Sequence, residues 1–373
     1  MVEPAITALT EQLKKLGNAS SLHSAGRAAR KDLEQAREII AEAIDCAASE
    51  VVFTSTGTEA NNLAVKGLYW QGVKSNKKVI ITSTFEHHAV ADPINWLAEH
   101  EGAQVVRIGV DRNGFIDLVE LKEKVNEHKN NVALISIMHS NNEVGTLQDI
   151  DQVVKIAGNI PVHSDCVQSF GKVDLSFNKL GLTAATISAH KIGGPLGVAA
   201  LILKRGLDIE PVLHGGGQER DLRSGTFNVP GIISFAAAAK NAMENKKERE
   251  FKVRELKQEL IETIKKNISD AWVNGNIDKS LPGIVSITFP KTDSEGLLLL
   301  LDGEGIACST GSACSAGVQR PSHVLLAMGL TEDETTSTLR FSLSYTNTIN
   351  EIAKLGSVIA TVVARSKAAS GKK

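Results

Sequence analysis

The stretch Thr183-Ala184-Ala185-Thr186-Ile187-Ser188-Ala189-His190-Lys191-Ile192-Gly193-Gly194-Pro195 contains the pattern that decides the fold. Its first half has the small and β-branched residues typical of a buried strand over 184–188. Its end favours a turn, and the glycines leave room for a bulky ring. A lysine at the end of a buried strand can form a Schiff base with a cofactor, because burial lowers the pKa of its amine. Lys191 is therefore a candidate catalytic residue, and the alternative is an ordinary solvated lysine.

Short apolar runs separated by helical patterns recur on both sides of this stretch. The pattern predicts a helix over 29–44, with its apolar residues on one face. The predicted strands are 51–54, 79–82, 105–108, 132–138, 160–163, 184–188 and 198–203. This alternation predicts an α/β fold with a mostly parallel seven-stranded sheet covered by helices on both faces. In such sheets, ligands bind beyond the carboxyl ends of the strands.

The pattern changes after a long helical stretch at about 230–266. The predicted elements that follow are strands at 271–273, 283–289, 306–308 and 337–343 and helices at 297–301 and 349–363. These short mixed elements predict a smaller α+β domain. We expect a large domain over 16–245 and a small domain over 246–373 that also includes 1–15.

The composition is that of an ordinary globular protein. The 373 residues are 42% hydrophobic and 23% charged, and 41 basic against 43 acidic residues give a net charge of −2. This balance does not favour direct binding of nucleic acid or of a membrane surface. No apolar run approaches the roughly 20 residues that a membrane helix needs. Residues 1–16 lack the apolar core of a secretory signal, so we expect a cytoplasmic protein.

The four cysteines are too few and too scattered to form a disulfide framework, and no Cys-x-x-Cys pair suggests zinc. We expect Cys46 and Cys166 to be buried apolar residues. Cys308, at the end of a predicted strand, is either structural or able to form a disulfide with Cys314. The small residues around Cys314, over 311–317, are typical of a mobile loop.

Polar clusters follow two of the predicted strands. The cluster Thr56-Gly57-Thr58-Glu59-Ala60-Asn61 opens a helix. Its free N–H groups and hydroxyls suit a phosphate, or else cap the helix in the ordinary way. The cluster Glu86-His87-His88 follows the strand at 79–82. A histidine there could stack on an aromatic ring, bind a metal or cap a helix. A metal site is the weakest of these interpretations, because no second ligand lies four residues away. We therefore expect no metal in this protein.

Asp165 follows the predicted strand that ends at His163. A carboxylate at the end of a central strand can keep a pyridine nitrogen protonated, which makes the ring an electron sink. A helix cap is the alternative. Asp165 and Lys191 are about one βαβ unit apart, so we expect both to reach the same crevice.

Two of these motifs together resemble the pyridoxal-phosphate site of the class V aminotransferase-like superfamily. They are Asp165-x-x-Gln168 and Ser188-Ala189-His190-Lys191. The segment 308–315, Cys-Ser-Thr-Gly-Ser-Ala-Cys-Ser, narrows the resemblance to the NifS/IscS-type cysteine desulfurases. Six separate motifs occur in the family's order, so the resemblance covers nearly the whole chain. It implies fold type I of the pyridoxal-phosphate enzymes and pyridoxal 5′-phosphate as cofactor.

The resemblance also implies a role for each matching residue around that cofactor. Lys191 would hold it as a Schiff base and then move a proton, Asp165 would pair with the pyridine nitrogen, and His87 would stack on the ring as a further catalytic residue. The other cofactor-binding residues would be Gln168 and Asn142 at O3′, Gly57, Thr58, Ser188 and His190 at the phosphate, and Thr226 at the phosphate of the neighbouring subunit of a homodimer.

For the substrate, the resemblance points to L-cysteine. Arg340, in Leu339-Arg340-Phe341, matches the arginine that binds the substrate carboxylate, and Asn18 would assist it. An arginine suits this role because its guanidinium can donate two parallel hydrogen bonds to a carboxylate. Cys314 matches the nucleophile that takes the substrate's sulfur as a persulfide and leaves alanine. A mobile loop suits a residue that must reach both the cofactor and an acceptor.

The chain departs from the family pattern in three places. It begins inside the first helical region, without the preceding strand and Ala-Thr-Thr turn, which leaves its stability and activity open. It ends without the long extension that docks an iron–sulfur scaffold, so the sulfur acceptor is open between such a scaffold and a protein of tRNA thiolation. Thr56 replaces a glycine, which is tolerable if its φ is negative. The alternatives are a selenocysteine lyase, another class V enzyme, or a truncated non-catalytic homologue.

Overall fold

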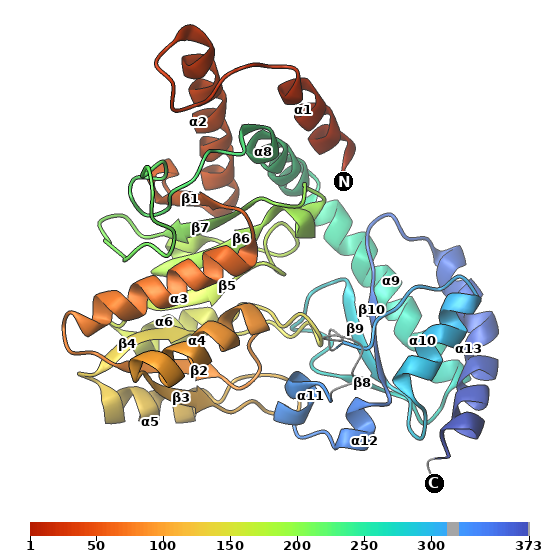
Figure 1. Cartoon of the computed structure of the whole chain (residues 1–373). Coiled ribbons are helices and arrows are strands. Elements are labelled where there is room, and N and C mark those ends of the chain that lie inside the picture. Colours follow the sequence, from red (N-terminus) through yellow and green to blue (C-terminus); the bar gives the residue numbers. More distant parts are fainter. Residues whose placement is uncertain (312–320, 372–373) are drawn as a thin grey trace. The chain divides into compact units, whose positions relative to one another are not determined.

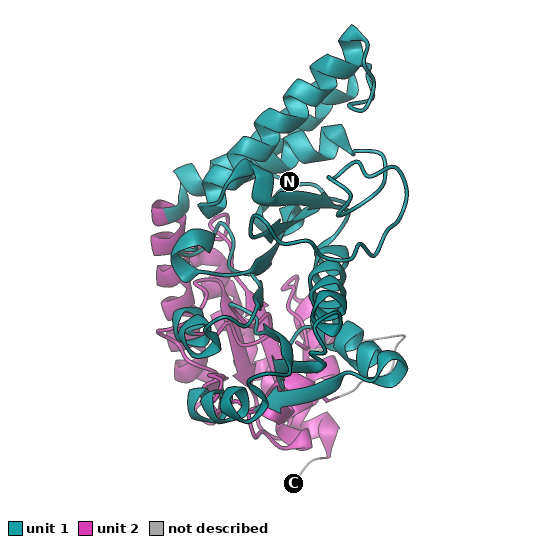
Figure 2. Ribbon diagram, turned by 90° about the vertical axis from the view of Figure 1, so that its left-hand side faces the viewer, with its two compact units in different colours: residues 1–108, 118–139, 149–246 teal, residues 109–117, 140–148, 247–373 magenta. Residues whose placement is uncertain are grey.

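The computed structural model describes residues 1–311 and 321–371, which form two compact units (Figures 1 and 2). Unit 1 comprises Met1–Ile108, Leu118–His139 and Asp149–Lys246. Unit 2 comprises Gly109–Asp117, Ser140–Gln148 and Lys247–Lys373. Two short segments from the middle of the chain therefore belong with the C-terminal unit, which the run of sequence alone does not show.

Unit 1 is built on a seven-stranded sheet with the order β1-β7-β6-β5-β4-β2-β3. The strands are β1 (Val51–Thr54), β2 (Val79–Ser83), β3 (Gln104–Ile108), β4 (Val132–Ser136), β5 (Val162–Asp165), β6 (Ala184–Ser188) and β7 (Ala199–Leu203). β7 runs antiparallel to both of its neighbours, and the other pairs are parallel. The mostly parallel seven-stranded sheet expected from the sequence is confirmed.

The helices of unit 1 surround this sheet. They are α1 (Glu3–Leu13), α2 (Ser24–Ile44), α3 (Gly57–Val73), α4 (His88–Glu101), α5 (Leu118–His128), α6 (Ile150–Ala157), α7 (Phe177–Leu180) and α8 (Val229–Glu244), with 3-10 turns η1 (Ala48–Glu50) and η2 (Ala189–Ile192). α2 shows how the sequence sets a helix: Leu33, Ala36 and Ile40 form its buried stripe. The ring of His23 accepts from the N–H of Gly26 at its start, and Asp45 ends it in the left-handed conformation.

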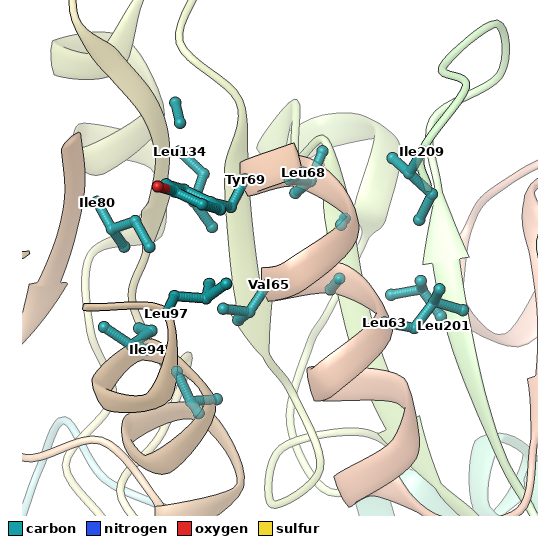
Figure 3. Packing of buried hydrophobic residues seen from close by; sticks show 14 of the residues in the cluster. Leu63, Val65, Leu68, Tyr69, Ile80, Ile94, Leu97, Leu134, Leu201 and Ile209 are labelled. Atoms are coloured by element: carbon teal, nitrogen blue, oxygen red, sulfur yellow. The ribbon is translucent and has the colours of Figure 1, made fainter. Parts of the chain in front are cut away.

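A large hydrophobic core joins α3 and α4 to the sheet (Figure 3). Leu63 and Leu68 of α3 and Leu97 of α4 are almost completely buried with Ile80 of β2 and Leu201 of β7. These contacts hold α3 rigidly against the sheet, because interiors packed this densely allow little displacement.

The first helix belongs to unit 1, whereas the sequence analysis grouped residues 1–15 with the C-terminal domain. The hydroxyl of Ser234 in α8 donates to the carbonyl of Ala5 over 2.7 Å, and Ala5 is fully buried. The N–H of Val2 donates to the carbonyl of Gly193 over 2.8 Å. These tertiary contacts decide where α1 packs, and the sequence carries no local signal for them.

Unit 2 is built on a three-stranded antiparallel sheet with the order β10-β9-β8. Its strands are β8 (Trp272–Asn274), β9 (Ile284–Thr288) and β10 (Thr338–Ser342), and its helices are α9 (Lys246–Asn267), α10 (Ser294–Gly303), α11 (His323–Ala327), α12 (Glu332–Thr335) and α13 (Ile349–Ser370). Buried residues of α9, α10 and α13 form a core with this sheet. The smaller unit is therefore of the α+β kind.

Three expectations for this half of the chain were wrong in detail. The stretch 230–266 is two helices, because α8 ends at Glu244 and α9 starts at Lys246. The segment 306–308 is not a strand; Ser309 instead forms an isolated bridge with Arg340 through two backbone hydrogen bonds. The last helix continues beyond residue 363 to Ser370. None of the helices in the described part of the chain combines the length and apolarity needed to span a lipid bilayer.

Candidate active site

The polar clusters of unit 1 lie at one edge of its sheet. β1 and β6 are both antiparallel to β7, and Thr54 and Ser188 lie opposite the same residue, Ala199. Asp165, at the end of β5, is paired with Thr186. The carboxyl ends of β1, β5 and β6 therefore meet at this edge, which is where ligands bind in α/β sheets.

The start of α3 carries Gly57 and Thr58, the residues predicted at the phosphate. Thr56 is its N-cap, with φ −150°, and its hydroxyl accepts from the N–H of Glu59 over 3.0 Å. The first backbone bond of the helix runs from Ala60 to Thr56, so the N–H groups of Gly57 and Thr58 precede it. The structure shows the cap, and the phosphate-binding role of these N–H groups stays a prediction. The negative φ of Thr56 makes threonine acceptable in place of glycine.

Gly57 lies where there is little room for a side chain. A Cβ atom at residue 57 would lie 3.1 Å from Cγ2 of Val167 and 3.7 Å from Cβ of Ser188. Gly57 and Ser188, both expected at the phosphate, are therefore neighbours.

The turn after β6 carries His190 and Lys191 in η2. The hydroxyl of Ser188 lies 2.8 Å from Nδ1 of His190. Burial lowers the pKa of His190, and the positive charges of Lys191 and Lys172 lower it further. Several positive groups therefore surround this turn, which suits a phosphate dianion.

Two expectations about this turn were wrong. Lys191 is exposed rather than buried, because η2 carries it past the edge of the sheet. The second wrong expectation is that the glycines leave room for a ring, because a Cβ atom at Gly193 would lie 2.7 Å from Cγ1 of Val2. Gly193, with φ +81°, does end the turn as expected.

Asp165 is the buried carboxylate of the site, with 7% of its surface exposed. One oxygen accepts from the N–H of Val167 over 2.9 Å, and the other accepts from Nδ2 of Asn61 over 2.7 Å. Burial raises the pKa of Asp165, while these hydrogen bonds and the charges of His87 and Lys191 act in the opposite direction. The hydrogen bonds and nearby charges only partly offset the unfavourable effect of burial on the ionised carboxylate. A pyridinium group beside Asp165 would supply further positive charge and so fits this site.

His87 is the N-cap of α4, and its ring is exposed. Its Nδ1 accepts from the N–H of Ala89 over 3.0 Å, so the neutral ring carries its proton on Nε2. This cap hydrogen bond fixes the orientation of the ring, and stacking of His87 on the cofactor stays a prediction. No three His, Cys, Asp or Glu side chains come together as metal ligands anywhere in the described residues.

Three further predicted residues lie in unit 1. Gln168 is half-buried and accepts from Nζ of Lys172 over 3.3 Å. Thr226 is exposed, in the loop between β7 and α8. Asn18 is exposed, and its side-chain oxygen accepts from the N–H of Ser20 over 2.9 Å. Thr226 is therefore accessible to a second subunit, whereas Asn18 stabilises a local turn.

Arg340 and Asn142 lie together in unit 2. Nη1 of Arg340 donates to the carbonyl of Asn142 over 2.9 Å. Nε of Arg340 and Oδ1 of Asn142 are buried, and neither has a hydrogen-bond partner among the described residues. The guanidinium thus keeps a donor, Nε, that no described residue uses, and its role as a substrate clamp stays a prediction. The roles of Asn18 beside Arg340 and of Asn142 at O3′ stay predictions, because these residues are divided between the two units.

The nucleophile predicted at Cys314 lies outside the described residues. Burial raises the pKa of the other thiols, to about 12 for Cys166 and for Cys46 and to about 11 for Cys308. Thiols with such pKa values are not ionised near neutral pH, and the thiolate is the reactive form. Cys166 is fully buried, whereas Cys46 and Cys308 are half-buried.

Sequence reasoning placed Asn61 and Glu86 in motifs but assigned no role to either residue. Asn61 lies one helical turn after Gly57, on the same face of α3, and this spacing is the signal that could have found it. Glu86 precedes His87 but is buried, and one of its oxygens accepts from the hydroxyl of Ser83 over 2.6 Å and from the N–H of Met138 over 2.9 Å. Nothing in the local sequence marks Glu86 as buried.

Glu86 makes the stability of the protein depend on pH. Burial raises its pKa to about 8 from the ordinary 4.5, so the folded protein retains a proton that the unfolded chain releases. The stabilisation is complete below pH 4.5 and is lost as the pH rises to about 8, at about 1.4 kcal/mol per pH unit. Glu86→Gln has no proton to lose. From pH 6.5 to 8 we expect wild type to lose about 2 kcal/mol more stability than this variant, measured by urea unfolding of the cofactor-free protein.

This pH interval avoids the buried histidines. Burial lowers the pKa of His163 to about 3 and that of His139 to about 4, from the ordinary 6.5. The stability that these neutral histidines contribute is therefore constant above pH 6.5 and falls only below it. Glu38→Gln, at an exposed carboxyl on α2, is the matched control and should follow wild type. Equal pH dependence of wild type and Glu86→Gln would show that Glu86 is ionised throughout.

Comparison with known proteins identifies the family. The sequence profile of aminotransferase class V matches residues 1–355. The chain is also 43% identical over 370 residues to the IscS-like cysteine desulfurase of Mycobacterium tuberculosis, covering 98% of this chain and 94% of that protein. The chain belongs to the aminotransferase class V family. Within this class V family it groups with the cysteine desulfurases.

Solved structures agree with this assignment. A NifS-like protein superposes with a TM-score of 0.90 at 34% identity, covering 98% of this chain and 96% of its own. The protein SspA, solved in complex with cysteine, superposes with a TM-score of 0.78 at 30% identity, covering 93% and 97% of the two chains. The class V enzyme therefore has the type I fold of pyridoxal-phosphate enzymes, and its cofactor is pyridoxal 5′-phosphate.

Proposed function

We propose that this class V enzyme removes the sulfur atom of L-cysteine, giving L-alanine and a persulfide on Cys314. The observation that carries the proposal is the identity to a cysteine desulfurase over nearly the whole chain, at a site that has the charged groups this reaction needs. SspA, similar along most of its length, was solved with cysteine, which supports this amino acid as the substrate.

Residues of unit 1 hold the cofactor in this proposal. Pyridoxal phosphate supplies an electron sink when it is bound. Asp165 balances the charge of the pyridine nitrogen, and His87 stacks on the ring. The phosphate lies at the start of α3 and the turn after β6, and Lys191 moves the proton at the substrate's Cα. Gln168 binds at O3′; Asn142, the other residue predicted there, belongs to unit 2.

Residues of unit 2 act on the substrate. Nη1 of Arg340 donates to the carbonyl of Asn142, and Arg340 binds the carboxylate of cysteine with its remaining guanidinium N–H groups. The Cys314 thiolate attacks the γ-sulfur of the substrate: the new S–S bond forms as the C–S bond breaks. The electron pair of the C–S bond remains on the carbon, which takes up a proton to become the methyl group of alanine.

The assembly and the acceptor are part of the same proposal. Unit 1 exposes large apolar side chains, with Leu16 90%, Leu22 88% and Leu196 81% exposed, and Thr226 is exposed as well. Burial of such groups against a second copy is favourable, which supports a homodimer. The persulfide passes to an iron–sulfur scaffold or to a protein of tRNA thiolation. The cytoplasmic location stays a prediction.

The reaction is tested by its products. Purified enzyme with added pyridoxal phosphate and L-cysteine should release alanine and, with a thiol reductant, an equal amount of sulfide. In the same assay Arg340→Lys should raise the KM for cysteine by about 10- to 100-fold, because lysine cannot replace bidentate hydrogen bonding.

Arg365→Lys, at an exposed arginine on α13, is the control and should leave the KM unchanged. Sulfide released with pyruvate and ammonia in place of alanine would contradict the proposed reaction. A cofactor-loaded protein that is inactive on cysteine but active on selenocysteine would identify a selenocysteine lyase instead.

A further inference from the structure

We propose that Asn61 is a positioning residue for the cofactor, holding the carboxylate of Asp165 in place for the pyridine nitrogen. The proposal rests on the role given above to Asp165 and adds to it a residue on another element of the fold. Asn61 itself need not touch the cofactor, since it acts through Asp165.

The first evidence is the geometry around the carboxylate. Each oxygen of Asp165 has one fixed donor: Val167 N–H at 2.9 Å on one and Asn61 Nδ2 at 2.7 Å on the other. Rotation of the carboxylate would break one of these bonds at a buried position, which is costly. The lone pairs that remain on the two oxygens therefore have a defined direction.

The second evidence is the place of Asn61 on α3. Residues four apart lie on the same face of a helix, so Asn61 follows Gly57 by one turn. Gly57 approaches Val167 and Ser188 at the sheet edge. One rigid helix thus carries both Gly57, predicted at the phosphate, and the donor to Asp165, and the spacing of the two groups is set by a single helical turn.

The third evidence is that asparagine is unfavourable at this position on other grounds. It is a poor helix former, and Asn61 is 1% exposed. Its Oδ1 atom is buried and has no hydrogen-bond partner within the described parts of the chain. An apolar residue would pack there without leaving an oxygen unpaired, so the N–H group offered to Asp165 is what distinguishes asparagine.

The test compares two ligands on the full chain freed of cofactor. One is pyridoxal phosphate, and the other is its 1-deaza analogue, in which carbon replaces the ring nitrogen. Asn61→Leu should weaken binding of pyridoxal phosphate by about 10- to 100-fold, the range for a hydrogen bond to a charged group. Binding of the deaza analogue should be unchanged, because it has no ring nitrogen to pair with Asp165.

Two further variants make the outcome decisive. Asn61→Ala adds no bulk and should show the same selective loss, and Asn62→Leu, the next residue on α3, should bind both ligands as wild type does. Equal weakening of both ligands by both Asn61 variants would show a structural role and overturn the proposal. Asp165→Asn, measured in parallel, should also no longer bind pyridoxal phosphate in preference to the deaza analogue. If Asp165→Asn keeps the wild-type preference for pyridoxal phosphate, the roles proposed for Asp165 and for Asn61 are both wrong. If only the Asn61 variants keep this preference, the role of Asn61 alone is wrong.

Discussion

Lys191→Ala should lose the covalently held cofactor and at least about 10³-fold of the kcat/KM for cysteine, since it removes both the Schiff-base amine and a proton carrier. The structure places Lys191 in the turn after β6, with its charge close enough to Asp165 to influence that carboxylate. Treatment with borohydride followed by peptide mass spectrometry checks the prediction. The wild-type peptide containing residue 191 should gain the reduced cofactor, and the variant should gain none.

Lys204→Ala is the matched control. Lys204 is exposed and directly follows β7, whereas Lys191 is the third residue after β6. Because β7 runs opposite to β6, Lys204 lies at the other edge of the sheet. This variant should keep the covalent cofactor and the activity. A reducible covalent cofactor in Lys191→Ala would assign the Schiff base to another lysine.

Cys314→Ser should keep the cofactor and its visible absorption but lose sulfide production by at least about 10³-fold, as for removal of a nucleophile. The other three cysteines cannot substitute, because burial raises the pKa of their thiols to about 11 or 12. Mass spectrometry after a single turnover checks the residue directly. The wild-type peptide containing Cys314 should carry one additional sulfur atom.

Cys308→Ser separates the two cysteines of the same segment. Its thiol is half-buried next to the bridge between Ser309 and Arg340, and this variant should keep most of the activity. Normal sulfide release by Cys314→Ser, together with loss in Cys308→Ser, would make Cys308 the nucleophile. Normal release by both variants and by the double variant Cys308→Ser/Cys314→Ser would exclude a thiol mechanism at this segment.

The sequence by itself determined the main sheet and the candidates at its edge. Runs such as 184–188 are readable because a strand buried on both faces needs consecutive apolar or small residues. Asp165 and Lys191 could be placed at one edge because the carboxyl ends of parallel strands meet there. The motifs around them carried the family resemblance, which the comparisons confirmed.

Only the tertiary structure decided features that depend on contacts between distant residues. The segment 306–308 is predicted as a strand by its apolar pattern, but among the described residues the bridge to Arg340 forms at Ser309 instead. The exposure of Lys191 follows from the turn of η2, and the packing of α1 depends on Ser234. Asn61 meets Asp165 only after α3 packs on the sheet, since the two are far apart in the chain. Hydrophobic periodicity reports which face of an element is buried, and it does not specify which polar group that face will meet.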